Sequence, residues 1–305
     1  MRPRKKQLVL LVVGIFLSAV VAVWNAWPKK EVLPAETLGE LLEQTECLAA
    51  LEPFLDKAGI AKDTSLSEPP VQTTRLGVEL IESLNYEEYG LKFSKKGVLY
   101  RAVLMPSSYE NAPERPEGLL TEEEFRKQID EFLFLDIWGD AEDITYEIRV
   151  HPRSDLAEEY EPTSFDAMAQ RSYQGFLCAS GVSFSVDRRT GRMTEIANLP
   201  FKKPESLEVN ISKEEALGIA TAFASKKQIP TNSYEVQQLI THTSDFWSIT
   251  KTVLASFSPD TKLCWVIDFE PRARDYAIVV VDCATGKIVG GDLRQMPRPP
   301  DDNLN

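Results

Sequence analysis

"VSFSVDRRTGRMTEI" spans Val182–Ile196 and "IVVVDCATGKIVGG" spans Ile278–Gly291, and both carry the pattern D-x-x-T-G-[KR] after an alternating apolar run. Alternation with a period of two indicates a strand with one buried face. The aspartate can accept N–H bonds from the residues that follow it, and the glycine supplies a positive φ from which the next strand resumes. Each pattern therefore predicts a structural hairpin corner, built by Asp187, Thr190 and Gly191 in the first copy and by Asp282, Thr285 and Gly286 in the second.

Each corner closes a segment that opens with a capped helix. Thr121 with Glu124, and Ser212 with Glu215, match the S/T-x-x-E capping box, in which two side chains satisfy free N–H groups of the first turn. Apolar residues then recur at helical spacing, and alternating strands follow. A helix followed by an antiparallel meander, present twice, indicates a duplicated unit.

The N-terminus carries a targeting signal. Basic residues within 1–6 precede an uncharged apolar stretch, residues 8–24, at the short end of what spans a bilayer. Because basic residues stay on the cytoplasmic side, the pattern predicts a single-pass helix in the cell membrane, with the N-terminus cytoplasmic and the body outside. A cleaved leader with Val20 and Ala22 before the cleavage site is the alternative, and it also places the body outside the cytoplasm.

The predicted fold class is α+β, with an N-terminal transmembrane helix followed by tandem units of one helix on an antiparallel sheet. The predicted divisions are 1–27 for the cytoplasmic stub and anchor, 28–115 for a helical and hairpin region, 116–205 and 206–296 for the two units, and 297–305 for a disordered tail. Proline and short polar residues dominate the tail, which has little to bury.

Region 28–115 shows a weaker pattern than the two units. Leucines at near-helical spacing predict helices over 37–55 and 73–84, and two strands are expected around the Lys-Lys-Gly turn at 95–97. A helix followed by a hairpin is also the order expected of a degenerate third copy.

The negative charge of the chain argues against two classes of binding partner, nucleic acids and anionic lipid surfaces. The formal net charge is −13 at pH 7, although the first residues are basic. An acidic body repels phosphate backbones, so we expect no nucleic-acid partner. It also disfavours docking of the body on anionic lipid.

Four cysteines raise the question of disulfides in an exported chain. If the last long hairpin is centred between Ala273 and Arg274, Cys264 lies directly opposite Cys283, with Cα atoms about 4.5 Å apart, which a disulfide can bridge. We therefore predict a Cys264–Cys283 bond, while a register change of one residue would put the two thiols on opposite faces. The alternative is two free thiols that pack as small apolar groups, and the pairing of Cys47 and Cys178 stays open.

Motifs for catalysis or metal binding are weak. Ser248 and Lys251 match S-x-x-K, but the stretch has a strand-like pattern and lacks partner motifs. His151 and His242 lie in strand-like segments without the neighbours of a catalytic triad. The acidic run DIWGDAED could supply calcium ligands or a hydrolytic acid pair, but its spacing is not that of an EF-hand. Its carboxylates are Asp136, Asp140, Glu142 and Asp143. We therefore expect a non-enzyme without a cofactor or metal site.

Segments around the second corner resemble a known family. "SKEEALGIA" at 212–220 opens a helix, and "YAIVVVDCATGKIVG" at 276–290 forms a last hairpin, which together look like a PepSY domain, a small exported module. Residues 211–291 match this pattern well and residues 120–199 match it more loosely. The resemblance implies a helix packed on a curved antiparallel sheet, and, by analogy alone, peptide binding or peptidase inhibition.

These features lead to one main functional prediction. We expect a non-enzymatic, membrane-anchored extracytoplasmic protein that binds another envelope protein through sheet faces or strand edges, with modulation of an exported peptidase as the role implied by the resemblance. The alternative is a sensor or scaffold ectodomain that binds a small ligand. A hydrolase built on the acidic run is a third hypothesis.

Overall fold

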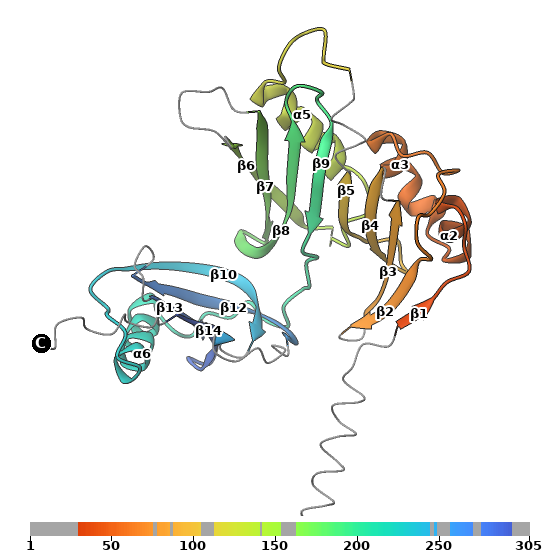
Figure 1. Ribbon diagram of the computed structural model, residues 1–305. Coiled ribbons are helices and arrows are strands. Elements are labelled where there is room, and N and C mark those ends of the chain that lie inside the picture. Colours follow the sequence, from red (N-terminus) through yellow and green to blue (C-terminus); the bar gives the residue numbers. More distant parts are fainter. Residues whose placement is uncertain are drawn as a thin grey trace, which may run out of the picture.

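The computed structural model of the chain describes residues 30–75, 78–85, 88–104, 113–140, 142–153, 163–244, 247–248, 257–270 and 276–294. Within these residues, one plan occurs three times: a helix followed by four antiparallel strands (Figure 1). We call the three copies modules A, B and C.

Module A contains two helices and the first meander. Its helices are α2 (Leu38–Gln44) and α3 (Leu48–Ala58), and its strands are β2 (Val71–Arg75), β3 (Val78–Asn85), β4 (Tyr89–Ser94) and β5 (Leu99–Leu104). The short strand β1 (Lys30–Val32) pairs with β2 at the edge of this meander.

Modules B and C each have one helix and four main strands. Module B consists of α5 (Glu122–Leu133), β6 (Ile144–Arg153), β7 (Ser164–Tyr173), β8 (Phe176–Asp187) and β9 (Met193–Asn198). Module C consists of α6 (Lys213–Lys226), β10 (Tyr234–Ser244), β12 (Phe257–Phe269), β13 (Tyr276–Asp282) and β14 (Ile288–Arg294), with β11 (Trp247–Ser248) between β10 and β12.

The helices begin where the capping residues predict. In α5 the Thr121 hydroxyl accepts from the Glu124 N–H and the Glu124 carboxylate accepts from the Thr121 N–H, and Ser212 and Glu215 do the same in α6. These reciprocal bonds satisfy N–H groups that have no partner inside the helix. Each helix then buries one apolar side on its sheet: Phe125, Ile129 and Phe132 in α5, and Ala216, Ala220 and Ala224 in α6.

The expected helix over 73–84 is wrong, because the described residues of this segment belong to β2 and β3. Its threonines, valine and isoleucine favour an extended backbone, and Gly77 weakens a helix. Pairing of β3 with both β2 and β4 then satisfies the backbone groups along its length. Region 28–115 thus contains a complete meander, and module A repeats the plan of modules B and C.

All three last hairpins turn at an equivalent corner. The N–H of Gly97 donates to Ser94 O at 2.9 Å, as Gly191 does to Asp187 O at 2.8 Å and Gly286 to Asp282 O at 2.9 Å. The three glycines have φ of 77°, 72° and 70°. A register shift precedes each corner, within β4, β8 and β13. Module A therefore has the same corner, but serine replaces aspartate and the loop is one residue shorter.

Modules A and B join through their last strands about a local two-fold axis. Ala102 follows Gly97 by five residues, Ile196 follows Gly191 by five residues, and these two residues are paired in the antiparallel β5–β9 ladder. Arg101 pairs with Ala197 in the same symmetric way. Equivalent strands thus meet as they would in a symmetric dimer. A single apolar core runs under both modules, between the sheet and helices α2, α3 and α5.

Module C has its own core, centred on α6, β12 and β13. It joins the rest of the sheet through a short parallel pairing, in which Leu239 and Ile240 of β10 lie beside Leu177 and Cys178 of β8. A small apolar cluster surrounds this junction, made of Tyr173, Cys178, Phe201, Ile240, Leu263 and Cys283.

The predicted fold class therefore needs correction on two points. The described strands form one continuous 14-stranded sheet, and the β8–β10 and β11–β14 pairs are parallel, so the sheet is mixed and the units are not separate antiparallel sheets. A free strand edge exposes N–H and C=O groups, which explains why neighbouring modules pair. The four described helices include none that is both long and apolar enough for a membrane span, and the expected anchor at 8–24 lies outside the described residues.

The predicted register of the Cys264–Cys283 hairpin is also wrong. Cys264 pairs with Asp282, so Cys283 lies one position beyond the residue opposite Cys264. Neighbouring strand residues point to opposite faces of a sheet, which separates the two thiols. The disulfide is absent, and Cys47, Cys178, Cys264 and Cys283 are all free and buried.

Candidate binding face and its two hollows

One face of the sheet of modules A and B is the candidate functional surface. Helices α2, α3 and α5 pack on the opposite face, and no described helix lies on this one; in Figure 1, α5 lies behind β7–β9. Because side chains alternate along a strand, every second residue points to this side. We call it the open face, defined by Glu82, Leu84, Lys92, Arg101, Val103, Glu195, Ala197, Ser183, Ser185, Asp166, Met168 and Gln170.

The first hollow lies on the module A part of the open face and has a volume of about 480 Å³. Its lining is mostly apolar and also contains four charged residues, Glu68, Glu82, Lys92 and Arg101. Lys92 pairs with Glu82, and Arg101 pairs with Glu195 at 2.8 Å. Such exposed pairs contribute about 0–1 kcal/mol each to stability. Both pairs can therefore rearrange at low cost.

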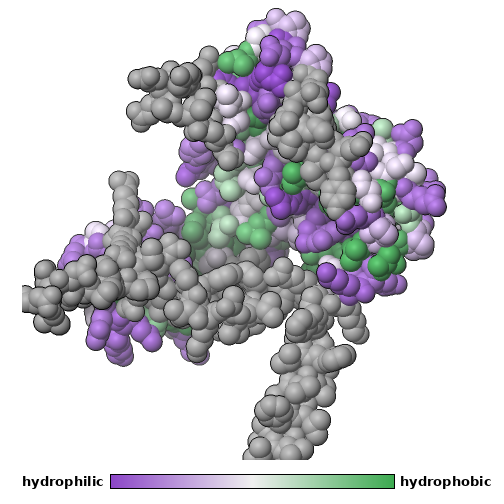
Figure 2. All heavy atoms as spheres, viewed as in Figure 1, coloured by the Kyte–Doolittle hydropathy of each residue, from purple (hydrophilic) through white to green (hydrophobic). Residues whose placement is uncertain are grey.

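The second hollow lies on the module B part and has a volume of about 390 Å³. Its rim carries two exposed apolar side chains, Met168 at 44% and Leu199 at 53% exposure. Figure 2 shows apolar side chains gathered at this lower end of β8 and β9. The lining contains no charged residue and consists of Met168, Gln170, Cys178, Ala179, Ser180, Gly181, Ser183, Ala197, Asn198 and Leu199.

The two hollows adjoin along the β5–β9 pairing. Arg101 lines the first hollow and Ala197 lines the second, and these residues are directly opposite each other in the ladder. The join of modules A and B therefore places a hollow that contains charged lining residues next to one that contains none.

A bulge in β8 shapes the second hollow. Gln170 pairs with Gly181 and Ser172 with Leu177, so β8 carries extra residues opposite β7. The Gln170 side chain donates to Cys178 O at 3.2 Å, and the Leu199 N–H donates to Gly181 O at 3.0 Å. A bulge redirects side chains locally. These bonds fix the bulged segment as the wall of the hollow.

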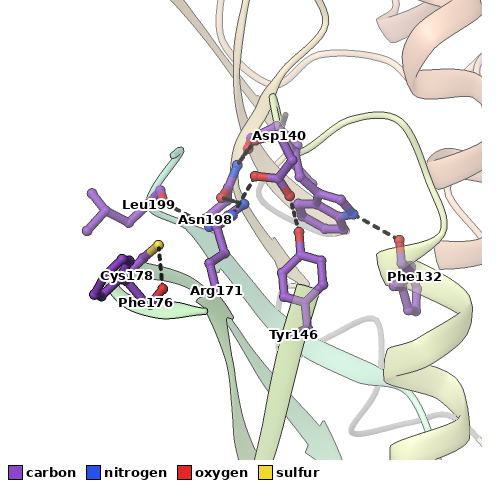
Figure 3. Close-up of polar contacts among 10 residues, drawn as sticks. Phe132, Asp140, Tyr146, Arg171, Phe176, Cys178, Asn198 and Leu199 are labelled. Atoms are coloured by element: carbon purple, nitrogen blue, oxygen red, sulfur yellow. Dashed lines mark hydrogen bonds and ion pairs between the residues drawn. The ribbon is translucent and has the colours of Figure 1, made fainter. Parts of the chain in front are cut away.

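Arg171, which is fully buried, holds the base of this region together (Figure 3). It forms an ion pair with Asp140 and donates to Leu199 O and to the side-chain oxygen of Asn198, both at 2.9 Å. Asp140 also accepts from the Tyr146 hydroxyl. The side-chain N–H groups of Asn198 donate in turn to the backbone oxygens of Leu99, at 2.7 Å, and Trp138, at 3.2 Å. The network thus ties β7, β9, β5 and the loop after α5 to one guanidinium.

This network was not predicted from the sequence. Arg171 shows no local motif, because its partners come from distant segments and only the fold brings them together. The isolated arginine in the otherwise apolar inward positions of β7 was the only available signal, since a buried charge requires paired partners.

Within the residues that the structure describes, the candidate catalytic and metal-binding side chains do not form a common site. Asp140, a candidate calcium ligand, forms an ion pair with Arg171 and accepts a hydrogen bond from the Tyr146 hydroxyl. His151 is exposed on β6, the backbone of His242 belongs to β10, and Lys251 of the S-x-x-K stretch lies outside the described residues. Across the part of the chain that the structure describes, there is no group of three or more His, Cys, Asp or Glu side chains that could hold a metal ion.

The corner residues connect each hairpin to its helix. The Asp187 carboxylate accepts from Thr190 N–H and the Asp282 carboxylate from Ala284 N–H, both at 2.8 Å. The backbone oxygen of the residue after the aspartate then accepts a hydrogen bond from the segment that leads into the helix. Leu120 N–H donates to Arg188 O at 2.8 Å, and Ile211 N–H donates to Cys283 O at 3.0 Å. In module A the Cys47 thiol, just before α3, donates the equivalent hydrogen bond to Lys95 O at 3.2 Å. These hydrogen-bonding groups of the corners are therefore already paired within the fold.

The outer edge of β6 is protected against strand addition. Arg126 donates to Ile148 O at 2.9 Å, and Pro152 lacks an N–H for a further ladder. The exposed side chains of Glu147 and Arg149 form an ion pair at 2.9 Å. Proline and charges on an edge strand discourage pairing with another chain. The open face is thus a better candidate for binding than this edge.

Comparison with solved structures finds a likeness in fold. No family model matches the sequence, and no curated protein matches it either. The chain is similar to the solved structure of the Bacillus megaterium YpeB C-terminal domain, at 9% identity and a TM-score of 0.34, covering 93% of this chain and 97% of that chain. What the open face can do therefore follows from its own residues.

Proposed function

We propose that the chain is a non-enzymatic binding protein whose open face receives a segment of another protein. The supporting observation is the pair of adjoining hollows on a helix-free sheet face, next to a strand edge that is protected. Hollows lined by apolar and convergent polar groups are the usual sites of recognition. The basic and then apolar N-terminal sequence supports a location outside the cytoplasm, and the PepSY resemblance makes an exported peptidase the first partner class to test.

The charge pattern suggests what kind of segment binds. The first hollow offers both signs of charge through Lys92, Glu82 and Arg101, whereas the second is uncharged. A segment with polar residues at one end and an apolar residue at the other matches this order. Because the whole chain carries a net charge of −13, a basic partner would associate faster than an acidic one.

A paired substitution tests the proposal. Ala197→Arg places a long charged side chain at the line where the hollows meet, and Ala61→Arg makes the same change at an exposed position outside the open face. We expect Ala197→Arg to reduce capture of envelope proteins by the immobilised chain at least tenfold, measured by quantitative mass spectrometry, and Ala61→Arg to leave it unchanged. Equal capture by both variants and the unmodified chain would exclude the open face as the binding surface.

A small-molecule sensor is the second candidate function. The volume of the second hollow, about 390 Å³, falls in the range of small-ligand pockets, about 300–1,000 Å³. A ligand that binds only the folded state raises the unfolding temperature in proportion to its concentration over Kd. A thermal-shift screen of neutral metabolites in the absence of protein partners therefore separates this function from protein binding.

A further inference from the structure

We propose that the second hollow is the specificity pocket of the open face and takes one uncharged, apolar side chain of the bound segment. This inference rests on the proposed function and names the chemistry that the site selects. Two independent features of the described residues carry it.

The first feature is the absence of charge in the lining. None of the ten lining residues is Asp, Glu, Lys, Arg or His, whereas the neighbouring hollow is lined by Glu82, Lys92 and Arg101. Arg171 lies behind the hollow, and Asp140 neutralises it there. A charged group that entered the hollow would lose water without gaining an ion pair, which is costly. The pocket therefore selects an uncharged group.

The second feature is the apolar rim. Met168 and Leu199 are among the few large apolar side chains that stay exposed in the described part of the chain, and both lie on this hollow. Covering them removes apolar surface from water, which favours an apolar occupant. The methionine side chain adapts its shape to different occupants.

The frame of the hollow is already fixed before binding. The bonds from Gln170 to Cys178 O and from Leu199 N–H to Gly181 O hold the bulge. Gly181 also leaves no room for a larger residue, since an added Cβ would lie 2.8 Å from Ala169 O. A preformed site loses less conformational freedom on binding. The occupant therefore meets a rigid wall and an adaptable rim.

The experiment uses the full chain labelled with 13C at the methionine methyl groups and the capped peptide acetyl-Ala-Leu-Ala-amide as the probe, with acetyl-Ala-Glu-Ala-amide as the charged control. The chain has five methionines, so the Met168 resonance can be assigned by substitution. We expect the leucine peptide to shift the Met168 resonance in a saturable way and to leave that of Met193, which is 7% exposed in the core, in place. The glutamate peptide should not shift Met168.

One variant and a control complete the test. We expect Leu199→Glu to weaken binding of the leucine peptide at least tenfold, and Leu119→Glu, at an exposed leucine outside the hollow, to leave the affinity unchanged. Equal shifts from both peptides, no shift of Met168, or unchanged affinity of Leu199→Glu would overturn the pocket assignment.

The capture assay separates this inference from the proposed function. If Ala197→Arg abolishes capture of the partner while Leu199→Glu does not, the open face binds but the second hollow is not its specificity pocket. If neither substitution affects capture, the proposed function itself fails. Loss of capture in both variants, with Leu119→Glu intact, supports both.

Discussion

At the scale of single residues, Arg171 shows how one buried charge can organise several segments. Its side chain is fully buried and contacts Asp140, Asn198, Leu199 O and the ring of Tyr146. A buried ion pair adds little net stability compared with apolar residues, but loss of one partner leaves an uncompensated charge. Asp140 is therefore a structural residue.

Substitution of Asp140 measures this dependence. We expect Asp140→Asn to lower the free energy of unfolding by about 3 kcal/mol, because the Arg171 guanidinium stays buried without its counter-charge. Asp143→Asn, three residues later at an exposed position, should change it by less than about 0.5 kcal/mol. Urea unfolding of both variants gives the two values. Equal effects of the two substitutions would contradict the role assigned to Asp140.

The cysteines allow a second prediction at this scale. Burial raises the pKa of the Cys264 thiol to about 12 and that of Cys178 to about 11, and it also raises the pKa of Cys47 and Cys283. Because the thiolate is the reactive form, all four should resist iodoacetamide in the folded chain at pH 8. In denaturant without reductant all four should react, as counted by mass spectrometry. Only two additions in denaturant would indicate a disulfide.

At the scale of elements, the corner glycines connect strand pairing to helix packing. Gly97 has φ of 77°, and a Cβ there would lie 2.5 Å from the Cβ of Ala50 in α3. Gly59 has φ of 70°, but nothing lies within 4 Å of an added Cβ. The two sites therefore separate the cost of a left-handed backbone from the cost of overpacking.

The comparison of Gly59→Ala with Gly97→Ala tests this separation. We expect Gly59→Ala to cost about 1 kcal/mol of unfolding free energy from backbone strain alone. Gly97→Ala should cost about 1–3 kcal/mol more, because the corner would be pushed away from α3. Adding Ala50→Gly should restore part of the second loss. If the two glycine variants unfold at the same denaturant concentration, the corner does not pack on the helix as described.

The α5 capping box gives a pH-dependent prediction. The Arg115 side chain, 2.6 Å from Glu124, is the main cause that lowers the pKa of that carboxyl to about 2, and bonds from Thr121 add to it. A lowered folded-state pKa means that the stabilisation is complete above the usual value of 4.5 and is lost as the pH falls from there to about 2. The gap in unfolding temperature between the unmodified chain and Arg115→Met should therefore be constant above about pH 5.5 and shrink towards pH 2.

A control isolates the carboxyl. In a Glu124→Gln background, Arg115→Met should produce a difference in unfolding temperature that does not change between pH 2 and 7. Thermal melts over this pH range measure both series. A pH-dependent difference in the Glu124→Gln background would show that another group is responsible.

At the scale of the whole molecule, local signals in the sequence predicted elements but not their assembly. The capping boxes at Thr121 and Ser212 form as expected, since each depends on residues only three positions apart. The sequence of the third copy shows only a weak pattern, because its corner has Ser94 in place of the aspartate and is one residue shorter before Gly97. The β5–β9 ladder, the Arg171 network and the second hollow depend on which strand edges meet, and the alternation of one strand does not specify its neighbour.

The shared core of modules A and B predicts which truncated chains fold cooperatively. Residues of both modules form one apolar cluster, and Ala102 pairs with Ile196 at its centre, whereas module C has a separate cluster around α6. A chain that ends at residue 205 should therefore unfold in one cooperative transition, because its core is complete. A chain that ends at residue 115 should not, because the underside of module A and the β5 edge would be exposed. Denaturant unfolding gives the test through the slope m, which scales with the surface exposed. Cooperative unfolding of the shorter chain would show that module A is independent and that the β5–β9 join is not needed for folding.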